Sequence, residues 1–428
     1  MELKLNYVNR IKMASVKING LTVVVGPNNS GKSTIGRALY STVKAVANTN
    51  MVKEEDKEDR IRKHIDSMYS RLHGLKHNAL NDELTNTFPR NSADFLTMIK
   101  ESSDPLSFLT EKRDYISGLD IVPRQKSLLL EDITNIGICF SQKDSPAANL
   151  RTELQYLIES EFLNTFCSIG SQNTEVALSS EGTSEIVFKA NENSVTYVHY
   201  DNSGFIEDAT YIESPLYIHL IDAIVRSRTY REIELNISMF NTMVPSHIKD
   251  MAEKILSAVR HPIDQKAHTS MDVKKIIGGE FSYNSNTRQI IYNEGGRSYS
   301  TINVASGIKS FGIVDLLEKA NFIGPNRLMI WDEPENHLHP EWQVLFAKKL
   351  VKLAEEGVPV LVTTHSPYFL QAIRYYAAQE KLGNYVNYYM PELREDGLST
   401  VVDVTNDLTQ VFERLTDPLG DIMDDHVQ

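Results

Sequence analysis

A glycine-rich loop at residues 26–34 constrains this chain more than any other stretch. It reads G-P-N-N-S-G-K-S-T and follows Leu21–Val25, an apolar run rich in β-branched residues and short enough for a buried strand. Apolar residues then recur at helical spacing from Ile35 to Val46. A G-x-x-x-x-G-K-S loop between a strand and a helix is typical of a phosphate-binding P-loop. The chain is therefore expected to build an α/β fold around a nucleotide site.

The chemistry expected of this loop follows from its backbone and two side chains. Backbone N–H groups cradle phosphate oxygens, and the helix that starts near Lys32 adds the positive end of its dipole. Lys32 is expected to reach the β- and γ-phosphates and the Ser33 hydroxyl to bind Mg²⁺, so ATP and Mg²⁺ are the implied ligands. The expected nucleotide-binding residues of the loop are Gly26, Asn28, Asn29, Ser30, Gly31, Lys32, Ser33 and Thr34.

A second segment, residues 328–340, reads as a buried strand that ends in acidic residues. Four apolar residues precede Asp332 and Glu333. Asp332 is expected to hold Mg²⁺, directly or through a water. Glu333 is placed to polarise the attacking water as general base. The alternative is an acidic turn that follows a strand by chance, which the P-loop upstream disfavours.

A third segment, residues 358–367, is another apolar run, and it ends at His365. Ser366 can cap the next helix, and Pro367 suits its first turn. Because sites in open parallel sheets form at the carboxyl ends of strands, His365 is expected to contact the γ-phosphate or to orient the water. A structural role is the alternative for a lone histidine.

Two weaker signals accompany these segments. Ser306 and Gly307 open a stretch with helical spacing of apolar residues, which indicates either an anion-binding helix terminus or a plain helix cap. Glu335, His337 and His339 suggest a separate metal site, but no further ligand cluster in the sequence supports one.

Composition narrows the class of protein. Of the 428 residues, 41% are hydrophobic and 24% charged, an ordinary globular balance that allows two or three compact units. The net charge of −13 argues against affinity for nucleic acid over the whole surface. Without an apolar run of about 18 residues or a signal-peptide core, no membrane span is expected. Cys139 and Cys167 make neither a disulfide framework nor a zinc set, which indicates the cytoplasm.

Short strands are predicted at both ends of the first half of the chain. Residues 3–8, 13–18 and 21–25 read as strands, and Asn19-Gly20 between the last two is a hairpin signal. Residues 174–212 read as four strands separated by turns, and a further hairpin turns at 284–286.

The residues between these strands read as mainly helical. Residues 50–75 are dense in charge but carry an apolar stripe at helical spacing, which predicts a solvated helix with one buried side. The expected units are an N-terminal lobe at 1–50, a mainly helical insertion with antiparallel strands near 174–212 at 51–300, and a C-terminal lobe at 301–428.

Together these segments resemble the ABC-type ATPase head, in which P-loop, insertion, signature, Walker B and switch histidine follow in that order. The string D-E-P-E-N-H-L-H-P at 332–340, with T-H-S-P at 364–367, is further similar to the OLD-like ATPases. These include the ATPase parts of bacterial anti-phage systems such as Septu, Gabija and PARIS. The resemblance implies a P-loop NTPase head of the α/β class with a mixed sheet, plus a large helical and β-hairpin insertion.

The resemblance has two departures. Gly307 is followed by Ile308 where ABC transporters have a second glycine. The glutamine of the family's second switch loop is not evident, and both Gln142 and the segment 211–215 are candidates for its position.

The resemblance also implies a mechanism. Two heads pack head to tail around two ATP molecules, so the chain is expected to be an ATP phosphohydrolase and a homo-oligomer. Each site would take Lys32, Glu333 and His365 from one chain and Ser306 and Gly307 from the other. Hydrolysis would reopen the dimer, which makes the head a conformational switch.

The output of such a switch is the last expectation. The stretch after His365 is too short for the Toprim nuclease that many OLD-like proteins carry, so we expect a sensor or regulatory ATPase of an anti-phage complex with a separate effector, a nuclease. The alternative is a DNA repair or recombination clamp, which the lack of heptads and the acidic charge disfavour. A transporter subunit fits the subgroup motifs less well. Nucleic acid is a further candidate partner, and no membrane partner is expected.

Overall fold

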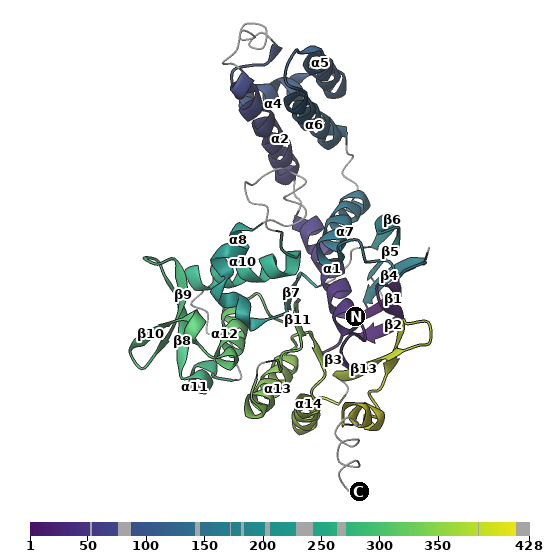
Figure 1. The fold of residues 1–428 in the computed structure, drawn as a ribbon, viewed down its shortest axis with the longest axis vertical. Coiled ribbons are helices and arrows are strands. Elements are labelled where there is room, and N and C mark those ends of the chain that lie inside the picture. Colours follow the sequence, from purple (N-terminus) through teal and green to yellow (C-terminus); the bar gives the residue numbers. More distant parts are fainter. Residues whose placement is uncertain are drawn as a thin grey trace. The chain divides into compact units, whose positions relative to one another are not determined.

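The structure is a computed structural model, and it describes residues 1–51, 54–75, 87–141, 146–171, 173–180, 184–201, 206–227, 243–262, 271–336, 338–383 and 385–416. The chain forms two compact units (Figure 1). Met1–Ala47 and Leu150–Gln428 make the first, here called the sheet unit, and Asn48–Asn149 make the second, the helical unit. Among the described residues, no helix combines the length and the apolar character that a membrane crossing requires.

One mixed sheet of eleven strands organises the sheet unit. Its order is β6-β5-β4-β1-β2-β14-β13-β3-β12-β11-β7. The five strands from β13 to β7 are parallel neighbours, whereas β6, β5, β4, β1 and β2 pair antiparallel with one another. Between these two groups, β14 pairs parallel with β2 and antiparallel with β13. This confirms the predicted α/β class with a mixed sheet. The strands are β1 (Glu2–Val8), β2 (Ile11–Lys17), β3 (Leu21–Val25), β4 (Thr174–Ser180), β5 (Ser184–Asn191), β6 (Ser194–Asp201), β7 (Asp208–Ile212), β11 (Arg327–Asp332), β12 (Val360–Thr364), β13 (Val386–Leu393) and β14 (Ser399–Asp403).

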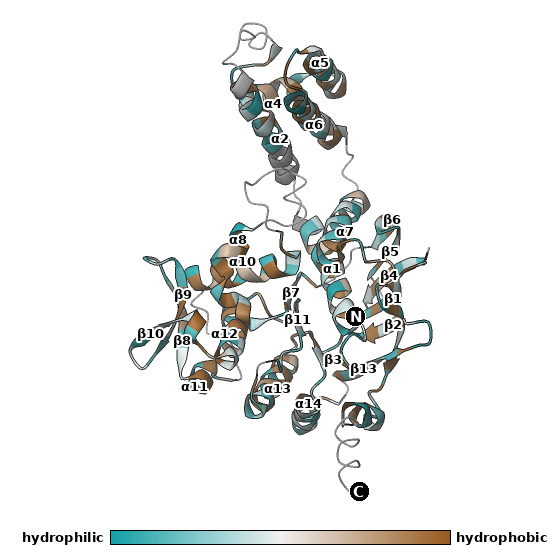
Figure 2. Cartoon of the chain, viewed as in Figure 1, coloured by the Kyte–Doolittle hydropathy of each residue, from teal (hydrophilic) through white to brown (hydrophobic). Residues whose placement is uncertain are grey.

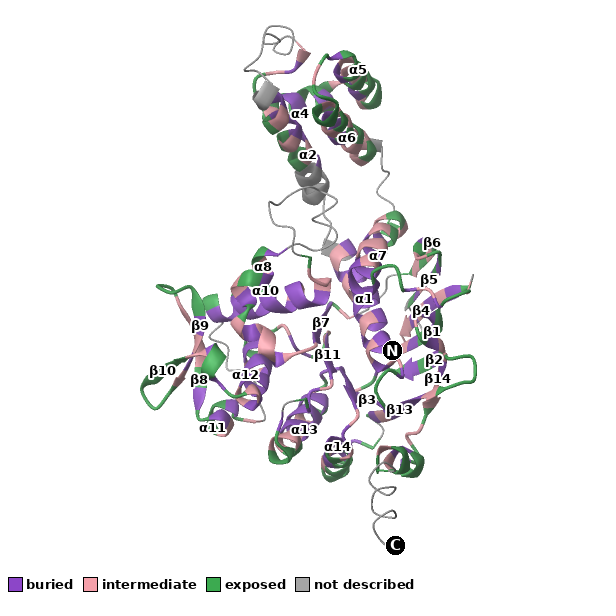
Figure 3. Ribbon diagram, viewed as in Figure 1, coloured by how far each residue is buried: buried purple, intermediate pink, exposed green. Residues whose placement is uncertain are grey.

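The central strands are buried on both faces because helices cover each side. In β3, Val23 and Val25 join one apolar cluster while Val24 joins the other, as the two-residue period of a strand requires. The helices α1 (Lys32–Met51) and α7 (Pro146–Phe162) pack on the Val24 side. The opposite cluster takes residues from α13 (Pro340–Glu355) and α14 (Pro367–Gln379), as Figure 3 shows by their buried sides.

A smaller antiparallel sheet, in the order β10-β9-β8, belongs to the same unit. The predicted hairpin is confirmed here, since β8 (Gly279–Asn284) pairs with β9 (Gln289–Glu294), and β10 (Arg297–Ser300) follows. Further described helices of the unit are η1 (Pro215–His219), α8 (Ile221–Arg226), α10 (Ser246–Arg260), α11 (Val273–Ile277), η2 (Thr301–Asn303) and α12 (Ser306–Lys319).

The helical unit has its own core. The predicted apolar stripe of Ile61, Ile65, Met68 and Leu72 is buried in a cluster that also holds Phe95. Hydrophobic and hydrophilic residues alternate around these helices (Figure 2). The helices of this unit whose bounds are described are α2 (Glu54–Leu75), α4 (Ser92–Glu101), α5 (Pro105–Gly118) and α6 (Pro123–Ser141).

Two expectations about the chain's course differ from the structure. The hairpin predicted at Asn19-Gly20 is wrong, because β13 and β14 lie between β2 and β3 in the sheet. Gly20 still turns the chain, with a φ of 62° that favours glycine, and a Cβ there would lie 2.4 Å from the Tyr385 carbonyl oxygen. The Gly20 carbonyl oxygen accepts a hydrogen bond from the Val360 N–H. The insertion expected at 51–300 is also divided differently: β4 pairs with β1, so residues 150–300 belong to the sheet unit.

Candidate functional site

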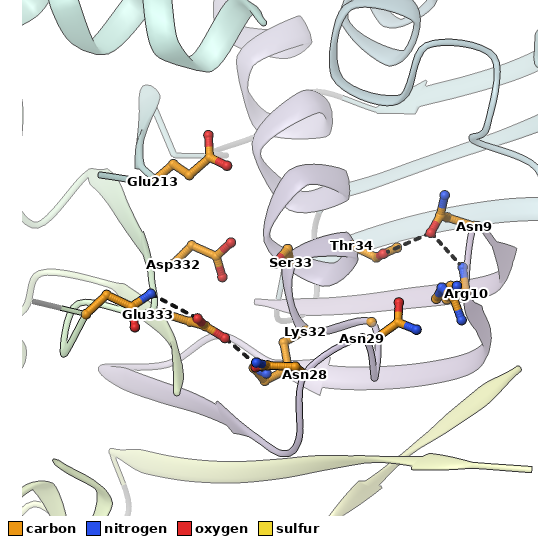
Figure 4. Close-up of a pocket in the computed structure, with 12 residues that line it drawn as sticks. Asn9, Arg10, Asn28, Asn29, Lys32, Ser33, Thr34, Glu213, Asp332 and Glu333 are labelled. Atoms are coloured by element: carbon orange, nitrogen blue, oxygen red, sulfur yellow. Dashed lines mark hydrogen bonds and ion pairs between the residues drawn. The ribbon is translucent and has the colours of Figure 1, made fainter. Parts of the chain in front are cut away.

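The three main motifs meet at the carboxyl ends of three adjacent strands. Val25 in β3 is level with Thr364 in β12, and Asp332 in β11 is level with Thr363. The loops that follow β3 and β11 border a cleft of about 430 Å³ (Figure 4), whereas His365, after β12, is not among the residues that line it. Its lining residues, all from the sheet unit, are Asn9, Arg10, Asn28, Asn29, Gly31, Lys32, Ser33, Thr34, Glu213, Asp332, Glu333 and Asn336.

The P-loop shape depends on backbone conformations that few residues adopt. Asn29 and Gly31 have φ values of 65° and 96°. A Cβ on Gly31 would lie 2.6 Å from Ile11 Cδ1, so only glycine fits. Gly26 and Ser30 do not line the cleft; the Gly26 N–H donates to the Thr364 carbonyl at 3.1 Å, and Ser30 is buried. Both therefore support the loop rather than face a ligand.

Lys32 is the first residue of α1 and is only 4% exposed. Its Nζ donates to the carbonyl oxygens of Gly26 and Pro27, each at 2.9 Å, and lies 3.2 Å from Glu333 Oε1. Buried ammonium groups need such partners, because an unpaired buried charge is costly. A phosphate bound by the loop would compete with Glu333 for this ammonium.

Glu333 is held at the cleft by an unusual backbone. Its φ is 47°, and its N–H donates to the Thr363 carbonyl at 3.2 Å. Asn336 Nδ2 donates to Glu333 Oε2 at 3.0 Å. Burial acts to raise the pKa of Glu333, but the Asn336 hydrogen bond and the Lys32 charge outweigh it and lower that pKa. The side chain is therefore ionised near neutral pH, the protonation state that a general base needs.

Asp332 is buried between two hydroxyl groups. Tyr211 donates to Oδ2 at 3.1 Å, and Thr363 donates to Oδ1. Burial, and then the charge of Asp332, raise the pKa of Tyr211 well above its ordinary value, so the phenol keeps the proton it donates. Asp332 and Ser33 both line the cleft, and their oxygens are the donors that Mg²⁺ prefers. The residue pair named from the sequence therefore fits this ion.

His365 lies where β12 ends and is partly exposed. Its Nδ1 lies 3.3 Å from Glu333 Oε1. The neighbouring Ser366 caps α14 by accepting the Phe369 N–H at 3.2 Å, with Pro367 in the first turn, so the predicted helix start is confirmed. The structure thus brings the histidine next to the expected base.

The two described members of the alternative metal site, Glu335 and His339, have other partners. Glu335 Oε1 accepts the Thr364 hydroxyl at 2.6 Å, whereas the His339 side chain caps α13. His337 lies outside the described residues. Among the residues that the structure describes, no group of three or more His, Cys, Asp or Glu side chains could hold a metal ion.

Three cleft residues carry no motif in the sequence. Asn9 and Arg10 come from the turn between β1 and β2, and the Thr34 hydroxyl donates to Asn9 Oδ1 at 3.3 Å. Glu213 follows β7, one of the two places considered for the second switch loop. The other, Gln142, lies outside the described residues. In the sequence, the only signal that could have identified Glu213 as a cleft residue is the polar turn after the strand at 209–212.

A buried histidine stands behind Glu213. His247 Nε2 lies 3.2 Å from Glu213 Oε2, and Nδ1 lies 2.5 Å from Glu161 Oε2. Burial alone would lower the pKa of His247, but the two carboxylates raise it to about 9. The hydrogen bond from His247 lowers the pKa of Glu213. An ionised carboxylate in the cleft is therefore supported by a buried positive charge.

Ser306 and Gly307 lie apart from this cleft. They open α12, and neither is among the residues that line the cleft. A Cβ on Gly307 would lie 2.7 Å from Trp342 Cε3, so glycine is required for the packing of α12 against α13. The structure does not bring the predicted signature residues to the nucleotide loop of the same chain.

Comparisons with known proteins identify one family and several solved structures with low sequence identity. The profile of a family described as AAA ATPase domain matches residues 6–370. No curated protein matches the chain. A solved SMC head domain from Thermotoga maritima is 13% identical, with 94% of this chain and 98% of that chain covered and a TM-score of 0.38. A Pyrococcus furiosus Smc head domain with an extended coiled coil, bound to the C-terminal domain of ScpA, is 12% identical, with 99% and 98% covered and a TM-score of 0.39.

Proposed function

Since this chain belongs to the AAA ATPase domain family and is therefore an ATPase, we propose that it is the sensor or regulatory subunit of an anti-phage defence complex with a separate nuclease effector. One observation carries the proposal. The cleft holds a set of groups suited to ATP hydrolysis, while the described residues contain no second cluster able to hold a catalytic metal. Phosphoryl-transfer sites work by positioning and electrostatics, so this cleft alone would not cut a nucleic-acid backbone.

The proposed hydrolysis uses the contacts already described. The backbone amides at the start of α1 and the Lys32 ammonium would bind the terminal phosphates. Lys32 would then exchange Glu333 for phosphate oxygens, and the freed carboxylate could accept a proton from the attacking water. Ser33 and Asp332 would hold Mg²⁺, which would neutralise charge on the phosphates.

The proposed active form is a head-to-tail dimer. Its support is the place of Ser306 and Gly307, which do not line the cleft of their own chain. In the dimer they would complete the partner's site with the amino end of α12, a natural anion-binding terminus.

Mixing two inactive variants tests this composite site. We expect Lys32→Ala and Ser306→Arg chains to regain ATP turnover when mixed, because one site per heterodimer then has both wild-type halves. Gly307→Asp is a poorer choice, since any side chain there collides with Trp342 of the same chain. Inactive mixtures that contain heterodimers, measured by light scattering, would contradict the composite site.

The helical unit is the proposed docking region for the effector. Every described residue that lines the cleft belongs to the sheet unit, so ATP chemistry does not explain residues 48–149. Deletion of the charged helix alone is not a clean test, because Ile65 and Met68 of α2 belong to the core of this unit. The whole unit is the appropriate element to remove.

Two experiments test the function itself. With Mg²⁺ or Mn²⁺, purified protein is expected to hydrolyse ATP and to leave DNA and RNA intact; cleavage that persists in Lys32→Ala would overturn the assignment of the nuclease to another protein. Expressed with its neighbouring genes, the chain is expected to reduce phage plaque counts on a bacterial lawn. Glu333→Gln should restore the plaques, and equal counts with and without the genes would contradict the defence role.

A further inference from the structure

Two glutamates in the loop after β11 occupy different surroundings. Glu333 lines the cleft and its side chain is 22% exposed, whereas the Glu335 side chain is 3% exposed and does not line the cleft. Glu335 Oε1 accepts hydrogen bonds from the Thr364 hydroxyl at 2.6 Å and from the His365 backbone N–H at 2.9 Å. The buried carboxylate is therefore fixed directly behind the histidine.

Burial of the Glu335 carboxyl group is unfavourable, because most of its interactions with water are lost. Glu335 Oε2 has no hydrogen-bond partner among the described residues, and burial raises the pKa of this carboxyl group. A glutamine oxygen would accept the same two hydrogen bonds without the cost of burying charge. A carboxyl group at this position therefore points to a partner besides Thr364 and the backbone.

The ring of His365 is such a partner. Its Nδ1 lies 3.6 Å from Glu335 Oε1 and 3.3 Å from Glu333 Oε1, so two carboxylates share one edge of the imidazole. The partner of one ring nitrogen decides which nitrogen carries the proton. Neither contact is a hydrogen bond, since the buried Nδ1 has no hydrogen-bond partner among the described residues. The ionised Glu333 carboxylate on this side nevertheless attracts a proton to Nδ1, which leaves Nε2, on the far edge of the ring, for a substrate oxygen.

We propose that Glu335 is a positioning residue for ATP hydrolysis that acts through His365. It holds the ring so that Nδ1 faces the two glutamates and Nε2 is turned away from them. Glu335 also competes with Glu333 for His365 Nδ1. The Glu333 carboxylate is then freer to accept a proton from the attacking water. This inference rests on the proposed roles of Glu333 and His365 in hydrolysis.

A double-mutant cycle tests the inference in the full-length protein. We expect Glu335→Gln to lower kcat by roughly 10-fold, the scale of partners that orient a functional histidine. KM for ATP should stay within about twofold, because no binding group is removed. In a His365→Ala background the same substitution should have no further effect on kcat, since the ring on which it acts is absent. Glu341→Gln, an exposed glutamate in the first turn of α13, is the matched control and should turn over ATP as wild type does.

A spectroscopic readout keeps the test sharp if the variant loses stability. In protein with ¹⁵N-labelled histidine, the His365 ring is expected to carry its proton on Nδ1, and Glu335→Gln should shift the population toward the Nε2 tautomer. A wild-type kcat in Glu335→Gln, an equal loss in both backgrounds, or an unchanged tautomer would overturn the positioning role. Full turnover by His365→Ala would instead remove the proposed role of the histidine in hydrolysis.

Discussion

The two units of this chain differ in where they place charge. The sheet unit buries Lys32, His247, Lys254 and Lys349, each beside a carboxylate. The described core of the helical unit consists of aliphatic and aromatic side chains, with the Arg71–Asp132 pair at 2.9 Å as its most buried ion pair.

This difference distinguishes the unit that holds the proposed catalytic groups from the unit that holds a mainly apolar core. A buried ion pair is by itself weak evidence for stability, because desolvation offsets much of the Coulomb attraction. An apolar core stabilises a fold more directly. The sheet unit thus retains charges that stability alone does not explain. Of these, Lys32 lines the cleft, and His247 supports Glu213, which also lines it. The apolar core of the helical unit is that of a stable folded unit, which fits its proposed role in docking the effector.

Removal of the expected base should have the largest effect. We expect Glu333→Gln to bind ATP and to lose on the order of 10²–10⁴ in turnover, the usual contribution of general base catalysis. Lys32→Ala should instead weaken nucleotide binding, measured by titration calorimetry. Glu341→Gln is the control. Wild-type turnover by a pure Glu333→Gln preparation would show that the base lies elsewhere.

A core substitution in the helical unit should separate stability from chemistry. Phe95 is fully buried there, and Phe95→Ala should cost about 3–5 kcal/mol of that unit's free energy of unfolding. ATP turnover should change by less than about twofold, because none of the described residues of this unit lines the cleft. Met98→Ala, at an exposed position of the same helix, is the control. Loss of ATP turnover in parallel with the unfolding of this unit would contradict the separation.

The buried histidine predicts a pH dependence confined to the sheet unit. The pKa of His247 is raised to about 9 in the fold, from an ordinary value near 6.5. Its stabilising contribution, on the order of 3 kcal/mol, is therefore complete below the unfolded pKa and is lost as pH rises through about 9.

Urea unfolding at about pH 6 and about pH 10 measures this contribution. Wild type should lose more stability between the two values than His247→Gln, while His199→Gln, an exposed histidine in β6, should behave as wild type. Equal losses in wild type and His247→Gln would show that the charge on His247 does not stabilise the fold.

The parts of the fold that the sequence predicted are those set by local pattern. The strand–loop–helix around Lys32, the acidic end of β11 and the Ser366 cap all depend on residues within one short segment. The Asn19-Gly20 signal failed because two strands from the far end of the chain, β13 and β14, lie between β2 and β3. Turn chemistry fixes a turn, but long-range pairing decides which strand lies beside which.

The site shows the same limit. Lys32, Ser33, Asp332 and Glu333 line one cleft, as their motifs predicted. Tyr211 could not be assigned from sequence, since its hydrogen bond to Asp332 spans 121 residues and a lone tyrosine carries no signature. The sequence-predicted trans role of Ser306 and Gly307 stays a prediction, because it concerns a second chain.

One experiment directly tests whether the sheet unit alone performs ATP hydrolysis. Residues 48–149 can be replaced by a flexible glycine-serine linker that joins Ala47 to Leu150, the boundaries of the sheet unit. We predict that the shortened chain folds and turns over ATP within about threefold of the full chain, as an independent domain would. A folded, monodisperse product whose turnover falls to the level of Lys32→Ala would contradict the claim that the sheet unit alone performs the chemistry.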